Sequence, residues 1–237
     1  MLNDKIKNQI LNHAKAEFPK ECCGLLIVVK GKHRYFACRN ISEDQNTFIL
    51  SPEDYAKAEE LGEVVAVVHS HCNERATPSQ ADLKACEASN LPWVIVSIPN
   101  EEWEQFEPKG FEAPLIGREY VYGVFDCYSV VRDWYKMHRG IELLDFERVP
   151  LWWERGGNWF LENYEKTGFY EVPIEDMQEG DLIFMQCSSQ AVNHCAVYLG
   201  ENKILQHCIN RLSSRDVYGG YWRQNTRKVV RFKECAK

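Results

Sequence analysis

The apolar run Val64–Val68 is followed at once by two histidines, His69 and His71, which one serine separates. A short continuous apolar run is typical of a strand that is buried on both faces of a sheet. Side chains two positions apart on an extended segment point the same way, so both imidazoles can face one point. The run therefore predicts a strand in the core of a sheet, with two potential ligands at its end.

A third potential ligand follows on a predicted helix. Pro78 and Ser79 are typical of a helix start, which places Asp82 in the first turn. Two histidines and one aspartate suit Zn²⁺ with a fourth position left for water, which is the layout of a catalytic rather than a structural zinc site. The spacing of Ser79 and Asp82 also fits a helix capping box, so a purely structural role for both residues stays open at this point.

Together these residues form the string H-x-H-x7-S-x-x-D, which resembles the signature of the JAMM (MPN) metallopeptidase family. That family also places a glutamate near the junction of its first helix and strand, and Glu21 stands there in this chain. The resemblance covers roughly residues 1–105. It implies an MPN-type α/β fold and a zinc-dependent peptidase.

The same resemblance implies a role for each residue of the signature. His69, His71 and Asp82 would hold Zn²⁺. Glu21 would act as the general base, and Ser79 would stabilise the oxyanion. Thiolates are also good zinc ligands, and three cysteines lie near this segment in sequence, so replacement of Asp82 by one of them is an open alternative. These cysteines are Cys22, Cys23 and Cys72.

Helical and extended periodicity predicts an α/β layered domain around the histidine strand. The expected elements are helices at 3–17, 51–62 and 79–90, strands at 22–29, 33–38, 63–69 and 93–98, and an edge strand at 102–107. A segment with Pro and Gly but no periodicity follows at 108–116. We therefore place a domain boundary there, between a first domain of residues 1–108 and a second domain of residues 116–237.

A cysteine begins the first helical pattern of the second domain. The apolar residues that recur at helical spacing after Cys127 are Val130, Val131, Trp134 and Met137. The positive end of a helix dipole lowers the pKa of a thiol at this position, which favours the reactive thiolate. The pattern therefore makes Cys127 a candidate nucleophile.

Two histidines of the second domain fall in predicted neighbouring strands. His194 lies in a strand at 192–200, and His207 lies in the next strand of the hairpin, at 203–208. Histidines on neighbouring antiparallel strands can lie side by side, so His194 can act as base to the Cys127 thiol while His207 orients it. A cysteine and a histidine in such positions are by themselves more often core residues, and that alternative stays open.

Three features follow one another in the second domain: the cysteine helix, the segment G-D-L-I-F and the strand N-H-x-A-V-Y-L-G. This order resembles the NlpC/P60 peptidases, a papain-like family with an α+β fold. The resemblance covers roughly residues 115–210. The resemblance implies Cys127 as nucleophile, His194 as base and His207 as the polar group that orients the base. It also implies that the Tyr120 hydroxyl helps to form the oxyanion pocket. The chain departs from the family in reading Tyr-Ser after the nucleophile, where the family has Ser-Gly.

The ten cysteines include no C-x-x-C pair, and several lie inside apolar runs. The N-terminal segment is polar and rich in lysine, without the apolar core of a signal peptide. We therefore expect reduced cysteines, most of them in the core, rather than disulfides. No run of eighteen apolar residues occurs, so no membrane span is expected.

Charge and aromatic residues are unevenly distributed along the second domain. The formal net charge is −7, yet residues 203–237 contain nine Lys or Arg and two Asp or Glu, which is +7. Because these cations are spread among Tyr, Trp and Val, we expect the solvated face of a sheet and no nucleic-acid partner.

The stretch 148–169 is rich in aromatic residues, and a core helix with its lid is favoured over a platform for glycans.

A JAMM domain followed by an NlpC/P60 domain resembles, over nearly the whole chain, the tail-tip assembly proteins of phages with long, non-contractile tails. The resemblance implies a zinc-dependent (iso)peptidase and a stem-peptide hydrolase that aid tail assembly and genome entry. The implied partners are other tail-tip proteins, among them one with a ubiquitin-like domain, and the stem peptides of peptidoglycan. The implied locations are the host cytoplasm during assembly and the virion tail tip, acting in the periplasm on entry.

Two other classes of function stay open. The chain could be a structural assembly factor whose two sites are vestigial, or a cellular isopeptidase that trims ubiquitin-like tags. Every residue expected for catalysis is present in both domains, which argues against decay of the sites.

Overall fold

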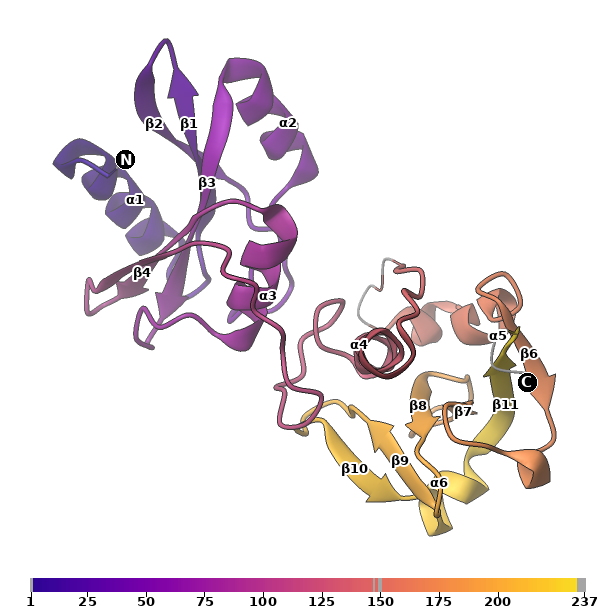
Figure 1. Cartoon of the computed structure of the whole chain (residues 1–237). Coiled ribbons are helices and arrows are strands. Elements are labelled where there is room, and N and C mark those ends of the chain that lie inside the picture. The colour runs from indigo at the N-terminus through magenta and orange to yellow at the C-terminus, as the bar shows by residue number, and fades with distance from the viewer. Residues whose placement is uncertain (1, 147, 149–150, 234–237) are drawn as a thin grey trace. The chain divides into compact units, whose positions relative to one another are not determined.

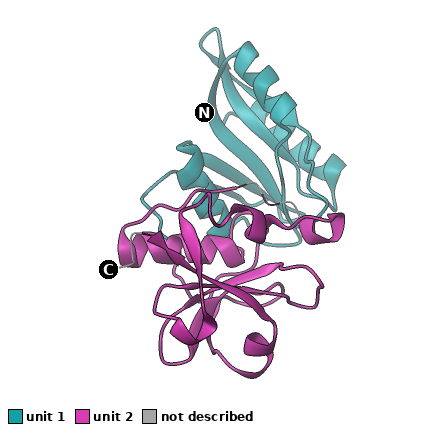
Figure 2. Cartoon of the chain, turned by 90° about the vertical axis from the view of Figure 1, so that its right-hand side faces the viewer, with its two compact units in different colours: residues 1–112 teal, residues 113–237 magenta. Residues whose placement is uncertain are grey.

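The first of two compact units, residues 1–112, is organised around a five-stranded sheet, and residues 113–237 form the second unit (Figure 2). The structure is a computed structural model that describes residues 2–146, 148 and 151–233. Each unit has its own sheet and its own apolar core.

The sheet of the first unit places the histidine strand at its centre. Its strands are β1 (Cys23–Val29), β2 (Lys32–Cys38), β3 (Glu63–Cys72), β4 (Trp93–Ile98) and β5 (Trp103–Phe106), in the order β2-β1-β3-β4-β5. Strands β3 and β4 are parallel, and the other neighbours are antiparallel. Strand β3 continues to Cys72, past its predicted end at His69, so both His69 and His71 are held within the sheet.

Helices cover both faces of this sheet, with α1 (Asp4–Glu17) on one side and α2 (Pro52–Leu61) and α3 (Gln80–Ser89) on the other (Figure 1). Helix α1 begins where the Asn3 side chain accepts a hydrogen bond from the N–H of Ile6, at 3.0 Å. Its apolar positions recur every four residues and pack on β1, β3 and β4. They are Ile6, Ile10 and Ala14. The predicted α/β layers are confirmed.

The second unit contains a six-stranded antiparallel sheet in the order β10-β9-β8-β7-β11-β6. The strands are β6 (Phe169–Val172), β7 (Leu182–Met185), β8 (His194–Tyr198), β9 (Lys203–Gln206), β10 (Ser214–Val217) and β11 (Thr226–Phe232). The helices are α4 (Cys127–Arg139), α5 (Trp159–Asn163) and α6 (Gly220–Gln224), with short 3₁₀ turns η1 (Trp152–Arg155) and η2 (Ile174–Asp176). This is the α+β class expected for the second domain.

Helix α4 packs on one face of the second sheet. Its buried stripe includes Val130, Val131, Trp134 and Tyr135, which meet Val197 of β8 and Leu205 of β9. Met137, which the helical spacing grouped with this stripe, is 50 % exposed. The stripe is centred toward positions 131 and 135, and Met137 therefore lies at its edge.

The aromatic-rich stretch packs against α4 and the sheet, as the core interpretation predicts. Phe160 is buried, and its ring lies 5.2 Å from that of Phe184 on β7. Trp159 meets the Tyr128 ring edge to face, with the centroids 5.5 Å apart. Residues 147, 149 and 150 of this stretch lie outside the described residues.

The nine cysteines in the described part of the chain are all unpaired, and seven of them are buried. The cations from residue 203 to residue 233 are spread over β9, β10, α6 and β11, so the expected sheet is present there. Among the described residues, no helix has the length and apolar character needed to cross a membrane.

Two candidate active sites

Three side chains converge at the end of β3. The Nε2 atoms of His69 and His71 lie 3.1 Å apart. Asp82 presents Oδ1 to His69 Nε2 at 3.2 Å and Oδ2 to His71 Nε2 at 3.3 Å. All three side chains are buried, and their ligand atoms lie within 4.8 Å of one another. The structure therefore brings together the two histidines and the aspartate that the sequence singled out.

Asp82 is both a capping residue and a member of this cluster. The Ser79 hydroxyl accepts a hydrogen bond from the Asp82 N–H at 3.1 Å, and Asp82 Oδ2 accepts from the Ser79 N–H at 2.8 Å. This reciprocal capping box begins α3 and fixes the carboxylate in the direction of the histidines. The two interpretations of this spacing are therefore compatible, because one carboxylate serves both.

In this structure the Ser79 hydroxyl is directed at the Asp82 carboxylate. It donates to Asp82 Oδ2 at 2.7 Å, so its single proton is already used. The oxyanion role expected for Ser79 needs that proton to be available. The geometry instead makes Ser79 the residue that holds Asp82.

The two histidine rings are oriented by different neighbours. His71 Nδ1 lies 2.9 Å from the backbone oxygen of Arg75, which places its proton on Nδ1 and leaves Nε2 free to bind a metal. The His69 ring stacks on Phe48 at 4.7 Å and meets Trp93 edge to face at 5.4 Å. This aromatic packing fixes the ring plane of His69.

The donor set fits a zinc ion. The two Nε2 atoms and the Asp82 carboxylate all present lone pairs to the same small space, and at most one proton can lie between the two nitrogens. A bound cation would therefore stabilise this buried cluster. Two imidazoles and one carboxylate leave the fourth tetrahedral position open. Among the described residues, no cysteine joins this cluster, and the Cys72 thiol donates instead to the backbone oxygen of Lys20. The alternative of a thiolate in place of Asp82 is not supported.

Glu21 is buried beside the cluster, two residues before β1 begins. Burial raises the pKa of Glu21 to about 8, with Asp82 adding to the rise and His71 opposing it. The Glu21 backbone is fixed on both sides, because its N–H donates to the oxygen of Gln45 and its carbonyl accepts from Asn40 Nδ2 at 2.9 Å. A carboxyl group held in this way can accept or release a proton near neutral pH.

Cys127 is the first residue of α4, as predicted. Asp126 caps the helix, and its Oδ1 accepts hydrogen bonds from the N–H groups of Tyr128 at 3.0 Å and Ser129 at 2.8 Å. Ser129 returns the contact, accepting from the Asp126 N–H at 2.7 Å. Ser129 is one of the two residues that depart from the usual family pattern. Its side chain completes a capping box with Asp126 at the helix end that carries the thiol.

Cys127 and His194 each have surroundings that favour the charged form of the side chain. Hydrogen bonds from Cys195 and His194 lower the pKa of Cys127 to about 5, against the opposing effect of burial. Burial lowers the pKa of His194, but its contacts with Cys127 and Cys208 outweigh that effect and raise it well above its usual range. Both shifts favour the thiolate and the imidazolium, the forms that a cysteine peptidase uses.

The residue that holds His194 is Gln206 and not His207. His194 Nε2 lies 2.9 Å from Gln206 Oε1. Strand β9 ends at Gln206, and its pairing with Ala196 puts the side chains of residues 194 and 206 on the same face of the sheet. His207 follows the end of the strand and does not share that face. The expectation that His207 orients His194 is therefore wrong in this geometry.

Gln206 is itself fixed by a neighbour. Its Nε2 donates to Asp216 Oδ2 on β10 at 2.6 Å, and Ser214 donates to the same oxygen at 3.2 Å. The amide can then present only its oxygen to His194. The hairpin register would have pointed to Gln206, because counting outward from the turn at residues 200–202 pairs position 206 with position 196.

His207 is fully buried beside Tyr120. The two rings meet edge to face at 5.1 Å, and neither ring nitrogen of His207 has a side-chain hydrogen-bond partner among the described residues. Burial lowers the pKa of His207 to about 4, so the ring is neutral at physiological pH. His207 supports the wall of the site through Tyr120.

A cavity of about 360 Å³ opens in front of the thiol. Tyr120, Cys127, His194 and His207 all contribute to its lining. Burial raises the pKa of Tyr120 above its usual range, so its hydroxyl stays protonated and can donate a hydrogen bond. The arrangement offers a nucleophile, a base and a hydroxyl donor around one space, which is the equipment for acyl transfer.

Comparison with known proteins matches each unit to a family. The model of prokaryotic homologs of the JAB domain matches residues 4–108, and the model of the NlpC/P60 family matches residues 117–231. Among solved structures, a JAB1/MPN domain protein from Archaeoglobus fulgidus covers 46 % of this chain and 87 % of its own, with 23 % identity and a TM-score of 0.31. An NlpC/P60 family protein from Bacillus cereus covers 94 % and 66 %, with 16 % identity and a TM-score of 0.35.

Two curated relatives match most of the chain. Tail tip assembly protein K of Escherichia phage N15 is 42 % identical over 238 residues, which cover 98 % of this chain and 96 % of that protein. Tail tip assembly protein K of Escherichia phage lambda is 38 % identical over 182 residues, which cover 77 % and 88 %.

Proposed function

The chain belongs to the family of tail tip assembly protein K, and from that membership we propose that it takes part in phage tail-tip assembly and carries two working peptidase sites. Its domains are those of the JAB and NlpC/P60 families. One observation carries the proposal furthest: the Cys127 thiol lies at the start of α4 in contact with His194, and Gln206 lies within hydrogen-bond distance of the Nε2 atom of that histidine.

We propose that Cys127 performs acyl transfer on the stem peptides of peptidoglycan. The thiolate attacks the carbonyl carbon, and the His194 imidazolium gives its proton to the departing amine, which leaves a thioester. His194 then takes a proton from water, and the resulting hydroxide cleaves the thioester to release the acid and restore the thiol. The Tyr120 hydroxyl and the Cys127 N–H can both donate to the oxyanion, and one such donor contributes about 3 kcal/mol.

The bond proposed for this reaction is the γ-D-glutamyl linkage to a diamino acid, by likeness to the NlpC/P60 family. The test incubates the full chain with purified peptidoglycan and identifies released peptides by mass spectrometry. Cys127→Ala should abolish release. Cys86→Ala, which changes a buried cysteine of the first unit, should retain it. If Cys127→Ala protein releases the same peptides, the second unit is not a cysteine peptidase and a structural assembly role is favoured.

A second activity is favoured by the convergence of His69, His71 and Asp82. We propose that these residues hold zinc, which when bound lowers the pKa of a coordinated water to near 7. Glu21 lies buried beside them and would move a proton from that water to the leaving amine. The proposed substrate is an isopeptide-like or C-terminal tail bond of another tail-tip protein, such as one with a ubiquitin-like domain.

Co-expression of the full chain with the neighbouring tail-tip proteins tests this second activity. A cleavage product should appear with the wild type and disappear with Glu21→Gln. Glu59→Gln, a change on the exposed surface of α2, should keep the product. Intact partners in the presence of wild-type protein would instead favour a docking role for the first unit.

The two activities would be used at different stages. We propose that the first acts in the host cytoplasm during tail assembly, and that the second acts from the virion tail tip on periplasmic peptidoglycan during genome entry. Quantitative mass spectrometry of purified virions tests the second part, because it requires the chain to remain in the mature tail.

A further inference from the structure

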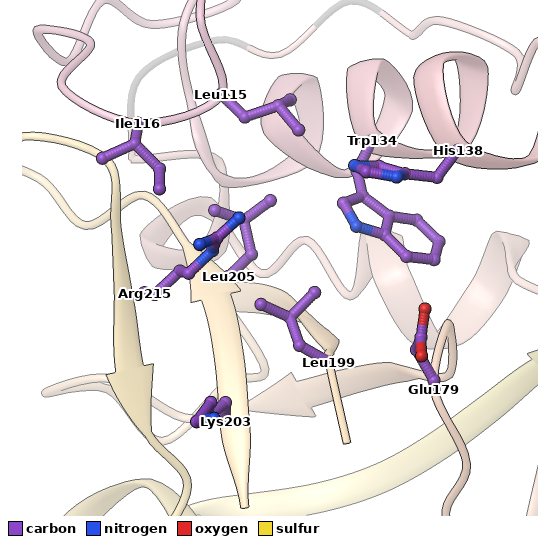
Figure 3. A pocket seen from close by; sticks show the side chains of 9 residues that line it. All are labelled: Leu115, Ile116, Trp134, His138, Glu179, Leu199, Lys203, Leu205 and Arg215. Atoms are coloured by element: carbon purple, nitrogen blue, oxygen red, sulfur yellow. The ribbon is translucent and has the colours of Figure 1, made fainter. Parts of the chain in front are cut away.

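A second cavity of residues 113–237 lies between α4 and the outer strands β9 and β10 (Figure 3). Its volume is about 270 Å³, and it shares no lining residue with the cavity in front of Cys127. We call it the α4–β10 cavity. Neither proposed peptidase reaction uses it.

The α4–β10 cavity exists because the helix does not extend over the edge of the sheet. Helix α4 packs chiefly on β8 and β9, and β10 is the last strand on that side. The strand register places Arg215 opposite Leu205, and Val217 opposite Lys203, so all four share the face on which α4 packs. Val217 is 72 % exposed, which shows that this end of the face is uncovered.

The floor of the cavity is apolar and buried. Leu205 of β9 and Trp134 of α4 are 2 % and 3 % exposed, and Leu199 lies between them and the rim. The apolar surface continues beyond the cavity to Ile116, which is 44 % exposed, and to Val217. An extended polypeptide segment can follow this apolar surface from the cavity to Ile116, and it can place one side chain in the cavity itself.

The cavity also contains a cation, Arg215, that has no ion-pair partner in the part of the chain that the structure describes. Figure 3 shows the Arg215 side chain extending over Leu205 into the hollow. Within the described residues, its guanidinium makes no hydrogen bond or ion pair. At the rim, Lys203 already pairs with Glu201 at 2.8 Å, His138 adds an ionisable ring and Glu179 adds a carboxylate, so the positive charge open to a ligand comes from Arg215. A planar guanidinium beside an apolar surface is suited to a carboxylate that it can bind through two hydrogen bonds.

We propose that the α4–β10 cavity binds an extended segment of a protein partner in which a carboxylate lies next to an aliphatic side chain. The aliphatic side chain fills the space above Leu205 and Trp134, and the carboxylate pairs with Arg215. A volume slightly below the roughly 300 Å³ of the smallest ligand sites accepts one or two side chains, and excludes a large cofactor. The binding is independent of catalysis at either site.

The test uses the full chain with ¹³C-labelled Leu and Ile methyl groups and two synthetic peptides. The acidic probe is acetyl-Glu-Leu-Asp-Leu-Glu-amide, and its matched neutral probe is acetyl-Gln-Leu-Asn-Leu-Gln-amide. We expect the acidic probe to shift the methyl signals of Ile116, Leu199 and Leu205 and to bind about tenfold more tightly than the neutral probe, since a charge-assisted pair is lost in the latter.

Arg215→Gln should weaken binding of the acidic probe about tenfold and leave the neutral probe unchanged. Arg223→Gln, which changes an exposed arginine of α6, is the matched control and should bind both probes as the wild type does. Ile116→Ser should weaken both probes, and because the residue is half exposed the variant should fold.

Three results would overturn the proposal. Equal affinity of the two probes, or of Arg215→Gln and wild type, would remove the role of charge. Shifts confined to signals around Cys127 would place the peptide in the other cavity. If hexanoate displaces the acidic probe and binds as tightly as that probe does, the cavity is a site for a small amphipathic acid and not for a polypeptide segment.

Discussion

His194 presents its Nε2 atom to the side-chain oxygen of Gln206 at 2.9 Å, while the same ring contacts Cys127. Because Gln206 is an acceptor here, the Nε2 of His194 must carry a proton, and the ring is fixed in orientation as well as tautomer. Asp216 in turn fixes the amide of Gln206. A line of three residues therefore positions the base for the thiol.

Gln206→Ala should slow stem-peptide release about 10- to 100-fold, because the base loses the group that orients it. His207→Ala should reduce it less, through the loosened packing of Tyr120. His194→Ala should have the largest effect of the three. Steady-state kinetics measure the order, and the melting temperature of each variant separates positioning from folding. A His207→Ala variant slower than Gln206→Ala would restore the role first expected for His207.

The thiolate of Cys127 should form at unusually low pH. The pKa of Cys127 is lowered to about 5, so its alkylation by iodoacetamide should rise as pH increases through about 5 and then level off. His194→Ala should move this rise toward the ordinary range of a thiol. Mass spectrometry of the peptide that contains Cys127 follows its alkylation separately from the other cysteines.

Cys195 contributes to the same pKa, and its effect can be isolated with a matched pair of variants. The hydrogen bond from Cys195 is the largest cause of the lowered pKa of Cys127. Cys195→Ala removes the donor and should raise the pH at which Cys127 is alkylated. Cys195→Ser retains a donor and should keep the rise near its wild-type position. Identical profiles for the two variants would assign the lowered pKa to His194 and the helix alone.

Purified protein should contain about one zinc per chain, held by His69, His71 and Asp82. His69→Ala and His71→Ala should each lose the metal, because two ligands leave an incomplete site. Cys72→Ser should retain it, since that thiol donates to the Lys20 carbonyl. Elemental analysis of dialysed samples provides the measurement. Full zinc in a His69→Ala/His71→Ala double variant would show that the metal lies elsewhere.

Arg148 should be important for stability although it is distant in sequence from the nucleophile. Its Nε pairs with Asp126 Oδ2 at 2.5 Å, and both side chains are nearly fully buried. Arg148→Met would leave the Asp126 carboxylate buried without its cation, and we expect it to reduce the free energy of unfolding by about 3 kcal/mol. Arg155→Met, at an exposed position of η1, should change it little. Urea unfolding of both variants tests the difference.

Features that depend on neighbours in sequence could be predicted from the sequence. His69 and His71 point the same way because side chains two apart on a strand share a face. Cys127 is the first residue of a helix because Asp126 caps that helix and apolar residues follow at helical spacing. The capping box of Ser79 and Asp82 is local in the same sense.

Features that depend on docking and register could not. Asp82 reaches both histidines only because α3 packs on the sheet beside β3. The hairpin register decides that Gln206, rather than the adjacent His207, faces His194. A shift of one residue would reverse that choice, because neighbouring side chains on a strand point to opposite faces. The sequence by itself therefore determined which residues carry the chemistry and on which elements they lie, and the tertiary structure decided which of them meet, because those contacts join segments far apart along the chain.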